Sequence, residues 1–550
     1  MRRKFLPAAA AVLTAVLAAF GLVSAGLAQS GSSAPPAAGV SAGPCIERGR
    51  TLEAQRRWGE ALAHYEDGLR QFPADGALRQ RFDVARLHFD VCRRYGDRSF
   101  RQGLARTPPP EGVDLYGEVL LKIHTHYVEA PKWNRLVEYG TRALEVALEE
   151  AAFLEANRLT ASEASRGAFL EELHRTLDPR PIQTRAEACD AVSAAAALAR
   201  QRLGLPPAAV MMEYACGAVS FLDHYSTYLT PDQLNEVYSQ IEGNFVGLGV
   251  VLKAQEGKLV ILRVIPNSPA KRAGIRDGDR ILAVDGKSTS ALSTDQAANL
   301  LQGEAGIAAE LVVAAPGGTP RQVRVERERV EVPSVEGARI EDRASGIAYL
   351  KLVCFQKTTL RDLDSALWSL HRAGMKALVI DLRENPGGLL DAAVDAADLF
   401  LQRGVIVYTR GRNAHENVTH SAHEAGTWRV PLVLIVDQDS ASAAEIFAGA
   451  LHDHRRATLV GRRTYGKGSV QGIFPLAAAG AGVRLTTAKF YSPSGQPYSG
   501  VGVEPDIQVH QVARPTGSAP AGSSPSPPSA DFDPMLAAAL QAAQQRVVQR

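Results

Sequence analysis

Residues 430–452, VPLVLIVDQDSASAAEIFAGALH, decide the fold class. The apolar run Val430–Val436 predicts a strand that is buried on both faces, and Ala443–His452 has the composition and spacing of a helix. A second buried strand is predicted over Ile347–Val353. Buried strands that run through short loops into helices are typical of an α/β fold with parallel strands.

The loop after this strand carries a serine, Ser442, at the predicted start of the helix. The positive end of the helix dipole favours negative charge on oxygen there, as an activated nucleophile requires. The alternative is structural, because Ser442 and Glu445 have the spacing of a capping box, and most serines so placed only cap a helix. This segment alone leaves both interpretations open.

A second segment, DLRENPGG at residues 381–388, continues a predicted strand, Ala377–Leu382, into two glycines, Gly387 and Gly388. Adjacent glycines let backbone N–H groups face a ligand with no Cβ in the way. The pair suits an oxyanion hole, or only a tight turn into a helix over Leu389–Phe400. Taken alone, the segment favours the turn.

A third segment, Arg463–Gln471, reads RTYGKGSVQ. Gly461–Lys467 nearly matches the phosphate-binding pattern G-x-x-x-x-G-K, but Gly468 stands where Ser or Thr is needed. Ser469–Phe474 also has the pattern of a strand where that loop needs a helix, so we reject a nucleotide site. Lys467 is instead a candidate general base, because burial lowers the pKa of a lysine; a solvated lysine is the plainer alternative.

Residues 243–330 consist of short apolar runs separated by Asp-Gly turn signals, with a helix predicted over Thr294–Leu301 and capped by Thr294 or Asp295. Their order of motifs resembles a PDZ domain, and by that resemblance one loop binds a chain-terminal carboxylate. The loop consists of Gly247, Leu248, Gly249 and Val250. Successive N–H groups in a glycine turn form a nest for an anion, and a strand edge beside it can pair with an extended peptide.

In this order, the three segments resemble the carboxyl-terminal processing peptidases, also called tail-specific proteases, over about residues 115–509. The stretches LDHYSTYL (222–229), LTTAK (485–489) and GVGVEPD (500–506) also match. The predicted fold is therefore multi-domain α/β: a crotonase/ClpP-like α/β protease core, an inserted mainly-β PDZ domain and an all-α N-terminal region.

The resemblance implies a serine endopeptidase with a Ser–Lys dyad, in which neutral Lys467 takes the proton of Ser442 and Gln471 orients the lysine amine. The oxyanion donors would be the backbone N–H groups of Ala443 and of Gly388 or Gly387. Substrates would be exported proteins that are cleaved near their C-termini after the PDZ domain has bound the tail.

Three positions depart from the family's pattern: Ala444 replaces the third serine, His224 stands where proline is common, and Glu384 replaces a small or amide residue. The first two are not the nucleophile, and the third leaves the charge of the glycine loop open.

Two rival hypotheses remain. His452 or His454 could act as the base, although a His-Asp-His sequence at a helix end is more typical of a solvated terminus. The chain could also be an inactive PDZ and TPR-like scaffold that binds protein C-termini. A scaffold would need neither the serine, the lysine nor the glutamine of the implied site.

The first residues have the pattern of an export signal. Arg2, Arg3 and Lys4 precede an apolar run over residues 5–23, and small residues permit cleavage after Ala25 or Ala28. The alternative is an uncleaved anchor, because the run approaches spanning length. Either way, we expect an exported protein, periplasmic or extracytoplasmic and membrane-associated.

Composition fits several soluble domains: of 550 residues, 45% are hydrophobic and 22% charged. Loss of the three basic residues of the presequence lowers the formal net charge from +2 to −1, so no nucleic-acid partner is expected. We expect protein or peptide substrates with accessible C-terminal tails, and a homo-oligomer or adaptor contact could use the helical N-terminal region. Five cysteines without CxxC spacing favour no metal site, and no cofactor is expected.

An exported protein can form disulfides, so Cys45–Cys92 or Cys189–Cys216 could pair, while Cys354 is expected to be a buried thiol. Gly49, Trp58, Ala61, Tyr65 and Pro73 resemble a single TPR, and a plain helical hairpin that caps the next helices is the alternative. The predicted organisation is a signal peptide (1–28), a linker (29–44), a TPR-like helical hairpin region (45–110), a helical region (111–242), the PDZ domain (243–330), the serine protease core (331–512), a disordered linker (513–531) and a C-terminal helix (532–550).

Overall fold

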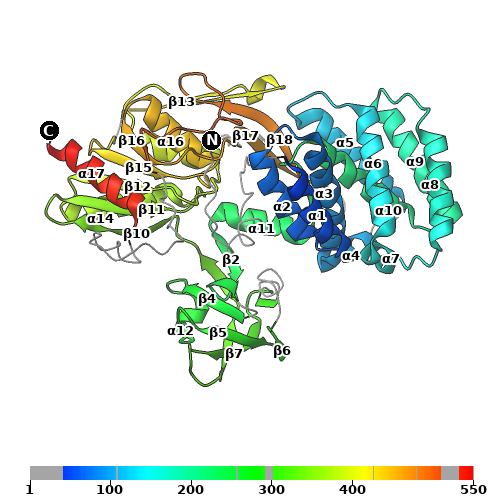
Figure 1. Ribbon diagram of the computed structural model, residues 1–550, viewed down its shortest axis with the longest axis horizontal. Coiled ribbons are helices and arrows are strands. Elements are labelled where there is room, and N and C mark those ends of the chain that lie inside the picture. Colours follow the sequence, from blue (N-terminus) through cyan, green and yellow to red (C-terminus); the bar gives the residue numbers. More distant parts are fainter. Residues whose placement is uncertain are drawn as a thin grey trace, which may run out of the picture.

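The computed structural model describes residues 41–106, 109–255, 258–290, 300–301, 303–424, 426–477, 480–509 and 532–548. The chain forms a helical N-terminal region, a small β-rich domain and an α/β core (Figure 1). The predicted signal peptide and the linker at 513–531 lie outside the described residues. In the described part of the chain, no helix combines the length and the apolar character needed to cross a membrane.

The N-terminal region is a set of packed helices. Its elements are α1 (Gly43–Ala54), α2 (Trp58–Gln71), α3 (Gly76–Gly96), α4 (Arg98–Arg106), α5 (Pro109–His126), α6 (Trp133–Glu149), α7 (Ala151–Ala156), α8 (Glu163–Leu177), α9 (Arg185–Leu203), α10 (Pro207–Leu222) and α11 (Pro231–Glu242). One strand, β1 (Thr227–Leu229), interrupts the helices that were predicted to be continuous. Its residues have high strand propensity, and it pairs with a strand of the core, which is why local helical periodicity does not reveal it.

Helices α1, α2 and α3 pack against one another around a shared apolar cluster. The ring of Tyr65 occupies the space that a Cβ on Gly49 would need, and its hydroxyl donates to Glu53 at 2.7 Å. The buried carboxylate of Glu150 then joins this unit to the following helices, since it accepts from Arg56 at 3.0 Å and contacts His88 at 2.6 Å. Helix α1 begins at Gly43, inside the predicted linker.

The β-rich domain is an antiparallel sheet with its own apolar core. Its elements are β2 (Asn244–Gly247), β3 (Val250–Gln255), β4 (Lys258–Val264), α12 (Pro269–Arg272), β5 (Arg280–Val284), β6 (Lys287–Ser288), β7 (Ala308–Ala314), β8 (Arg321–Glu326) and β9 (Glu328–Glu331). Strands β3, β4, β5, β7 and β8 form the main sheet, and β2 pairs with β9 as a two-stranded ribbon. Of the helix predicted over 294–301, all but its last two residues lie outside the described part.

The α/β core contains two sheets. Its elements are β10 (Val335–Asp342), β11 (Ile347–Leu352), α14 (Thr359–Arg372), β12 (Ala377–Asp381), α15 (Leu390–Asp398), β13 (Val405–Gly411), η1 (Ala414–Glu416), β14 (Thr419–Ser421), β15 (Leu432–Val436), α16 (Ala443–Asp453), β16 (Ala457–Gly461), β17 (Ser469–Pro475), β18 (Gly482–Tyr491), β19 (Ile507–Gln508) and α17 (Pro534–Val548). One sheet has the order β10-β11-β12-β15-β16-β19, in which only β10 is antiparallel to its neighbour. The other joins β1, β18, β13 and β14, with β17 paired to β18.

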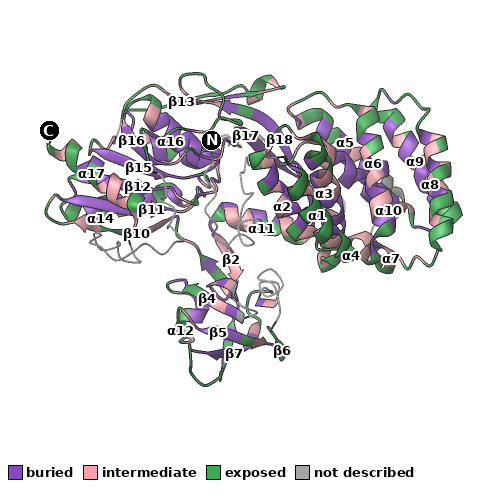
Figure 2. Ribbon diagram, viewed as in Figure 1, coloured by how far each residue is buried: buried purple, intermediate pink, exposed green. Residues whose placement is uncertain are grey.

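Helices cover both faces of the parallel sheet, which explains the unbroken apolar strands (Figure 2). Along β11, Ala348 and Leu350 face α14, α15 and α16, whereas Ile347 and Tyr349 belong to the cluster that α17 closes. The side chains of Ala539 and Ala543 in α17 are fully buried there. The C-terminal helix is therefore part of the core of the α/β domain.

The strands and helices predicted around the three motifs are confirmed within one or two residues, and α17, Pro534–Val548, lies within the C-terminal helix predicted over 532–550. All five cysteines are free thiols, so neither disulfide forms. Cys354 is only partly buried, because it lies in the loop after β11 and its thiol donates to Gln356 at 3.4 Å.

Candidate active site

Ser442 is the residue at which the loop after β15 becomes α16. Its backbone has φ 59° and ψ −116°, in the left-handed range that a side chain disfavours, and the residue is fully buried. Its hydroxyl has no hydrogen-bond partner among the described residues. A strained serine with a free buried hydroxyl is not acting as a helix cap.

Glu445 takes the capping role and does more. Its fully buried carboxylate accepts from the N–H of Ser442 at 2.7 Å. The same carboxylate accepts from the N–H of Lys467 at 2.9 Å, the N–H of Gly466 at 2.7 Å and the hydroxyl of Thr464 at 2.6 Å. Burial raises the pKa of Glu445, and these hydrogen bonds oppose the rise. One carboxylate thus joins the serine loop to the lysine loop, a connection that the spacing of a capping box did not predict.

Lys467 lies just before β17 and is 2% exposed. Its amine has no hydrogen-bond partner in the described structure and lies 4.8 Å from the centroid of the Tyr225 ring. Burial holds the pKa of Lys467 well below its ordinary value, and the charge of Arg484 lowers it further, while Glu445 and Asp223 act in the opposite direction. The amine is therefore neutral over a pH range in which a surface lysine is charged.

Neither the hydroxyl of Ser442 nor the amine of Lys467 has a hydrogen-bond partner among the described residues, so the two groups are not bonded to each other. They are nevertheless brought together, since their backbone N–H groups bond to the same oxygen of Glu445. Gln471 is fully buried beside them on β17, and its amide nitrogen donates to Ser469 at 2.9 Å. The amide oxygen of Gln471 accepts no hydrogen bond from a described residue.

The glycine turn lies against the serine. A Cβ on Gly387, whose φ is +99°, would lie 2.9 Å from both the Cβ of Ser442 and the nitrogen of Ala443. The N–H of Gly387 donates to the side chain of Asn385 at 2.9 Å. The N–H groups of Gly388 and Ala443 have no acceptor among the described residues. Of the two glycines that the sequence left open, Gly388 has the free donor.

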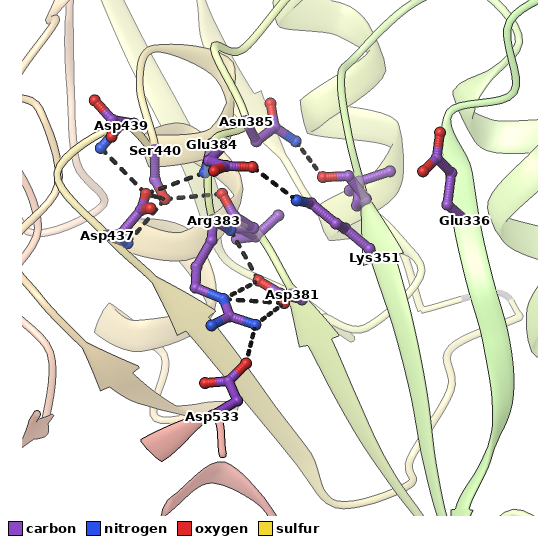
Figure 3. Close-up of polar contacts among 12 residues, drawn as sticks. Glu336, Lys351, Asp381, Arg383, Glu384, Asn385, Asp437, Asp439, Ser440 and Asp533 are labelled. Carbon is purple, nitrogen blue, oxygen red and sulfur yellow. Dashed lines mark hydrogen bonds and ion pairs between the residues drawn. The ribbon is translucent and has the colours of Figure 1, made fainter. Parts of the chain in front are cut away.

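Polar contacts hold the glycine turn and the serine loop together (Figure 3). The carboxylate of Asp437 accepts from the N–H of Glu384 at 3.1 Å and from the hydroxyl of Ser440 at 3.0 Å. Asn385 accepts from the N–H of Ala441 at 2.9 Å. The side chain of Glu384 is largely exposed and pairs with Lys351, so its charge points away from the turn.

The C-terminal helix reaches the same turn through an ion pair. Arg383 lies between Asp381, at 2.6 Å, and Asp533, at 2.8 Å (Figure 3). Asp533 stands just before α17, beyond a long linker in the sequence, and no local pattern pointed to this contact. The pair anchors α17 at the end of β12 from which the glycine turn leaves.

The two candidate histidine bases lie at the wrong end of the helix. His452 is paired with Asp506 at 3.1 Å, and His454 is within 2.8 Å of the carbonyl oxygen of Val405. Both follow Ser442 by about the whole length of α16, roughly 15 Å at 1.5 Å per residue. A Ser-His-Asp arrangement with either histidine is therefore wrong.

The loop Gly247–Val250 connects β2 to β3 in the small domain. Leu248 is buried, its carbonyl oxygen accepts from Ala270 at 2.9 Å, and Gly249 has φ +81°. The N–H groups of Leu248 and Gly249 have no acceptor in the described part of the chain. Two adjacent free donors in a glycine turn are the features that an anion nest requires.

Comparison with known proteins places this site in a family. The model of peptidase family S41 matches residues 346–509, and a PDZ domain model matches residues 260–314. The carboxy-terminal-processing protease of Bartonella bacilliformis is 38% identical over 301 residues, which are 54% of this chain and 68% of that protein. The chain belongs to the carboxyl-terminal-processing proteases. It is a serine-type peptidase of the C-terminal processing kind, and the inactive-scaffold hypothesis has no support.

Two further similarities accompany this assignment to the carboxyl-terminal-processing proteases. The carboxyl-terminal-processing protease of Synechocystis sp. is 36% identical over 292 residues, which are 52% of this chain and 68% of that protein. A solved structure titled photosystem II D1 C-terminal processing protease is 26% identical and covers 72% of this chain and 92% of its own, with a TM-score of 0.39.

Proposed function

We propose that this carboxyl-terminal-processing protease is an endopeptidase that uses Ser442 as nucleophile and Lys467 as general base. The observation that carries the proposal is the pair of buried, unpartnered groups, the serine hydroxyl and the lysine amine, on loops joined by Glu445. Burying polar groups without partners costs stability, so a purely structural role would not preserve them.

The first step is proton transfer. A neutral Lys467 amine accepts the proton of the Ser442 hydroxyl as the oxygen attacks the scissile carbonyl carbon. The amine and the hydroxyl lie on loops that share the carboxylate of Glu445, and such catalytic hydrogen bonds often tighten only when substrate is bound. The buried amide oxygen of Gln471 is a suitable acceptor for an N–H of the amine.

The second requirement is stabilisation of the oxyanion. The free N–H groups of Gly388 and Ala443 supply two donors, and Ala443 stands in the first turn of α16, where the helix dipole favours negative charge. The protonated lysine then gives its proton to the leaving amine, and water hydrolyses the acyl-enzyme with Lys467 again as the base. We also propose that the core is crotonase/ClpP-like.

The PDZ domain supplies tail recognition in this proposal. The free N–H groups of Leu248 and Gly249 would bind the terminal carboxylate of a protein substrate, and the edge of β3 would pair with its last residues. The charged N-terminal segment followed by an apolar run supports export to the periplasm or to the extracytoplasmic membrane surface. In the same proposal that segment is either cleaved or kept as a membrane tether, and the helical region makes an oligomer or adaptor contact.

The dyad is tested by measuring cleavage of denatured casein by Ser442→Ala and Lys467→Ala, with unfolding curves to check that each variant folds. Both variants are expected to lose activity and to keep their fold. A folded variant with wild-type activity at either position would overturn the assignment. His452→Ala is the matched control and is expected to retain activity, because that side chain lies at the far end of α16.

Tail recognition has its own assay. Fluorescence anisotropy compares binding of one apolar decapeptide in two forms, with a free C-terminal carboxylate and with a C-terminal amide. The carboxylate form is expected to bind more tightly, because the amide places an N–H group against the donors of Leu248 and Gly249. Equal binding of the two peptides would contradict the role assigned to this loop.

A further inference from the structure

The loop that joins α10 to β1, residues 223–226, closes one side of the lysine. The half-buried ring of Tyr225 presents its face to the amine of Lys467, 4.8 Å from the ring centroid. Tyr225 lies far outside residues 346–509, which match the peptidase family model. An apolar ring at this distance shields the amine from water, which disfavours its charged form, and limits where the amine can point.

Hydrogen bonds within the core fix the loop. The carboxylate of Asp223 accepts from the N–H groups of Tyr225 at 2.8 Å and Ser226 at 2.7 Å, which closes a tight turn. The partly buried guanidinium of Arg484 on β18 donates to the carbonyl oxygen of Tyr225 at 3.0 Å. The backbone of Tyr225 is thus held from both sides while its ring covers the lysine.

The N-terminal helices hold the same loop from outside. Arg86 of α3 donates to the carbonyl oxygens of Asp223 at 3.2 Å and Ser226 at 3.1 Å, on either side of Tyr225. The ring of Phe82, one turn earlier on α3, packs edge-on against His224 with centroids 5.2 Å apart. Two successive turns of α3 therefore contact the loop, through Phe82 and Arg86.

A second contact reaches the lysine loop directly. The guanidinium of Arg70 at the end of α2 lies over the ring of Tyr465, 5.5 Å from its centroid, and Tyr465 is two residues before Lys467. Helices α2 and α3 therefore touch both segments that enclose the amine. These two helices therefore contribute to the surroundings of the lysine as well as to the N-terminal region.

We propose that Tyr225 is a positioning residue that shields the amine of Lys467 from water and fixes its orientation. Helix α3 holds Tyr225 in place through Arg86. The proposal rests on the role of Lys467 as the base. The charged groups that face the amine are Arg484 on β18, Glu445 on α16 and Asp223 in the loop itself. None of these is altered by changing the tyrosine ring, so a change in the titration of Lys467 would report on the ring.

The test is the pH dependence of kcat/KM for denatured casein between pH 6 and 10. Tyr225→Ala admits water to the amine, so the rising limb of the profile is expected to move up by about one pH unit, with about tenfold lower activity below it and recovery at high pH. Tyr225→Phe keeps the ring and is expected to keep the wild-type profile. An unshifted limb in Tyr225→Ala, or an equal loss at every pH, would overturn the proposal.

The contribution of α3 is tested by Arg86→Met, which leaves the active-site residues intact. The rising limb of the kcat/KM profile of this variant is expected to move up by about half a pH unit, which lowers the activity below the limb about threefold. Arg101→Met is the control, because the side chain of this exposed arginine on α4 makes no hydrogen bond or ion pair with residues 223–226 in the described part of the chain. If Tyr225→Ala fails to fold, Arg86→Met decides the proposal alone, and an unshifted limb there refutes it.

The two proposals fail in different ways. Full activity in a folded Lys467→Ala variant refutes the dyad and, with it, the role of Tyr225. Loss of activity in Lys467→Ala together with wild-type profiles in Tyr225→Ala and Arg86→Met would leave the dyad intact and refute only the positioning role.

Discussion

Replacing Lys467 by methionine should stabilise the protein while it abolishes activity. The lysine amine is buried without a hydrogen-bond partner, and its pKa is held well below the ordinary value, so the folded state must keep it neutral. The unfolded chain holds that proton with a pKa near 10.4. Keeping the amine neutral therefore costs about 1.4 kcal/mol per pH unit below that value, down to the folded-state pKa, so the largest possible cost at pH 8 is about 3 kcal/mol. Methionine has similar length and no charge to lose.

The pH dependence fixes the sign of this effect. Between the lowered folded-state pKa of Lys467 and about 10.4, the unfolded chain binds a proton that the folded chain lacks, so wild-type stability rises with pH. The advantage of Lys467→Met should accordingly shrink by about 1.4 kcal/mol between pH 8 and pH 9. Below the folded-state pKa the advantage should stay constant, because the lysine is then protonated in both states.

The assay is chemical and thermal unfolding of both proteins at pH 8 and pH 9. A gain of about 3 kcal/mol corresponds to a rise of about 6–12 °C in the midpoint of the transition that includes the protease core. Lys376→Met is the control, since Lys376 is exposed and should show no such pH-dependent difference. A variant at position 467 that is no more stable than wild type, or whose advantage is equal at the two pH values, would refute the reasoning.

Three further substitutions test the contacts that hold the site in place. Glu445→Gln turns one acceptor oxygen into a donor and leaves two N–H groups unpaired, so we expect a loss of about 2–6 kcal/mol in urea unfolding; a fully stable variant would contradict this. Gly387→Ala would place a Cβ 2.7 Å from the carbonyl oxygen of Ala441 at a positive φ, so kcat should fall about 100-fold, and an unchanged kcat would refute the assigned close approach. Asp533→Asn removes a partly exposed ion pair with Arg383 and should cost only about 0.5–1 kcal/mol; a loss above about 2 kcal/mol would show that α17 depends on it.

The parts of the fold that the sequence could predict are those whose burial is local in the chain. The strands β11, β12 and β15 are apolar on both faces because helices cover both faces, so their runs are unmistakable. The C-terminal helix is bounded by a proline at its start and has an apolar stripe that meets the sheet. By contrast, β1 has only three residues and exists because β18 lies beside it, and such pairing is invisible in a local window.

The candidate site divides in the same way. Ser442 and Lys467 could be singled out because each lies in a short motif whose residue types suit one chemical step. Tyr225 and Arg86 could not, because Tyr225 contacts the lysine from more than two hundred residues away in the chain and Arg86 contacts only the loop that carries Tyr225. Asp533 could not be singled out for the same reason, because the second half of the core separates it in the sequence from its partner, Arg383.

The ambiguity at Ser442 resolves in a way that neither sequence interpretation anticipated. A capping box has two halves, and only the half made by Glu445 is formed here: the carboxylate accepts the N–H of Ser442, while the serine hydroxyl stays unpartnered. Because Glu445 also binds the lysine loop, the residue that satisfies the start of α16 also holds the two reacting groups in one frame. The motif is thus a cap through its glutamate, which leaves the serine free to react. A positive φ at Ser442 is consistent with this division, since a capping serine takes an extended backbone and this one does not.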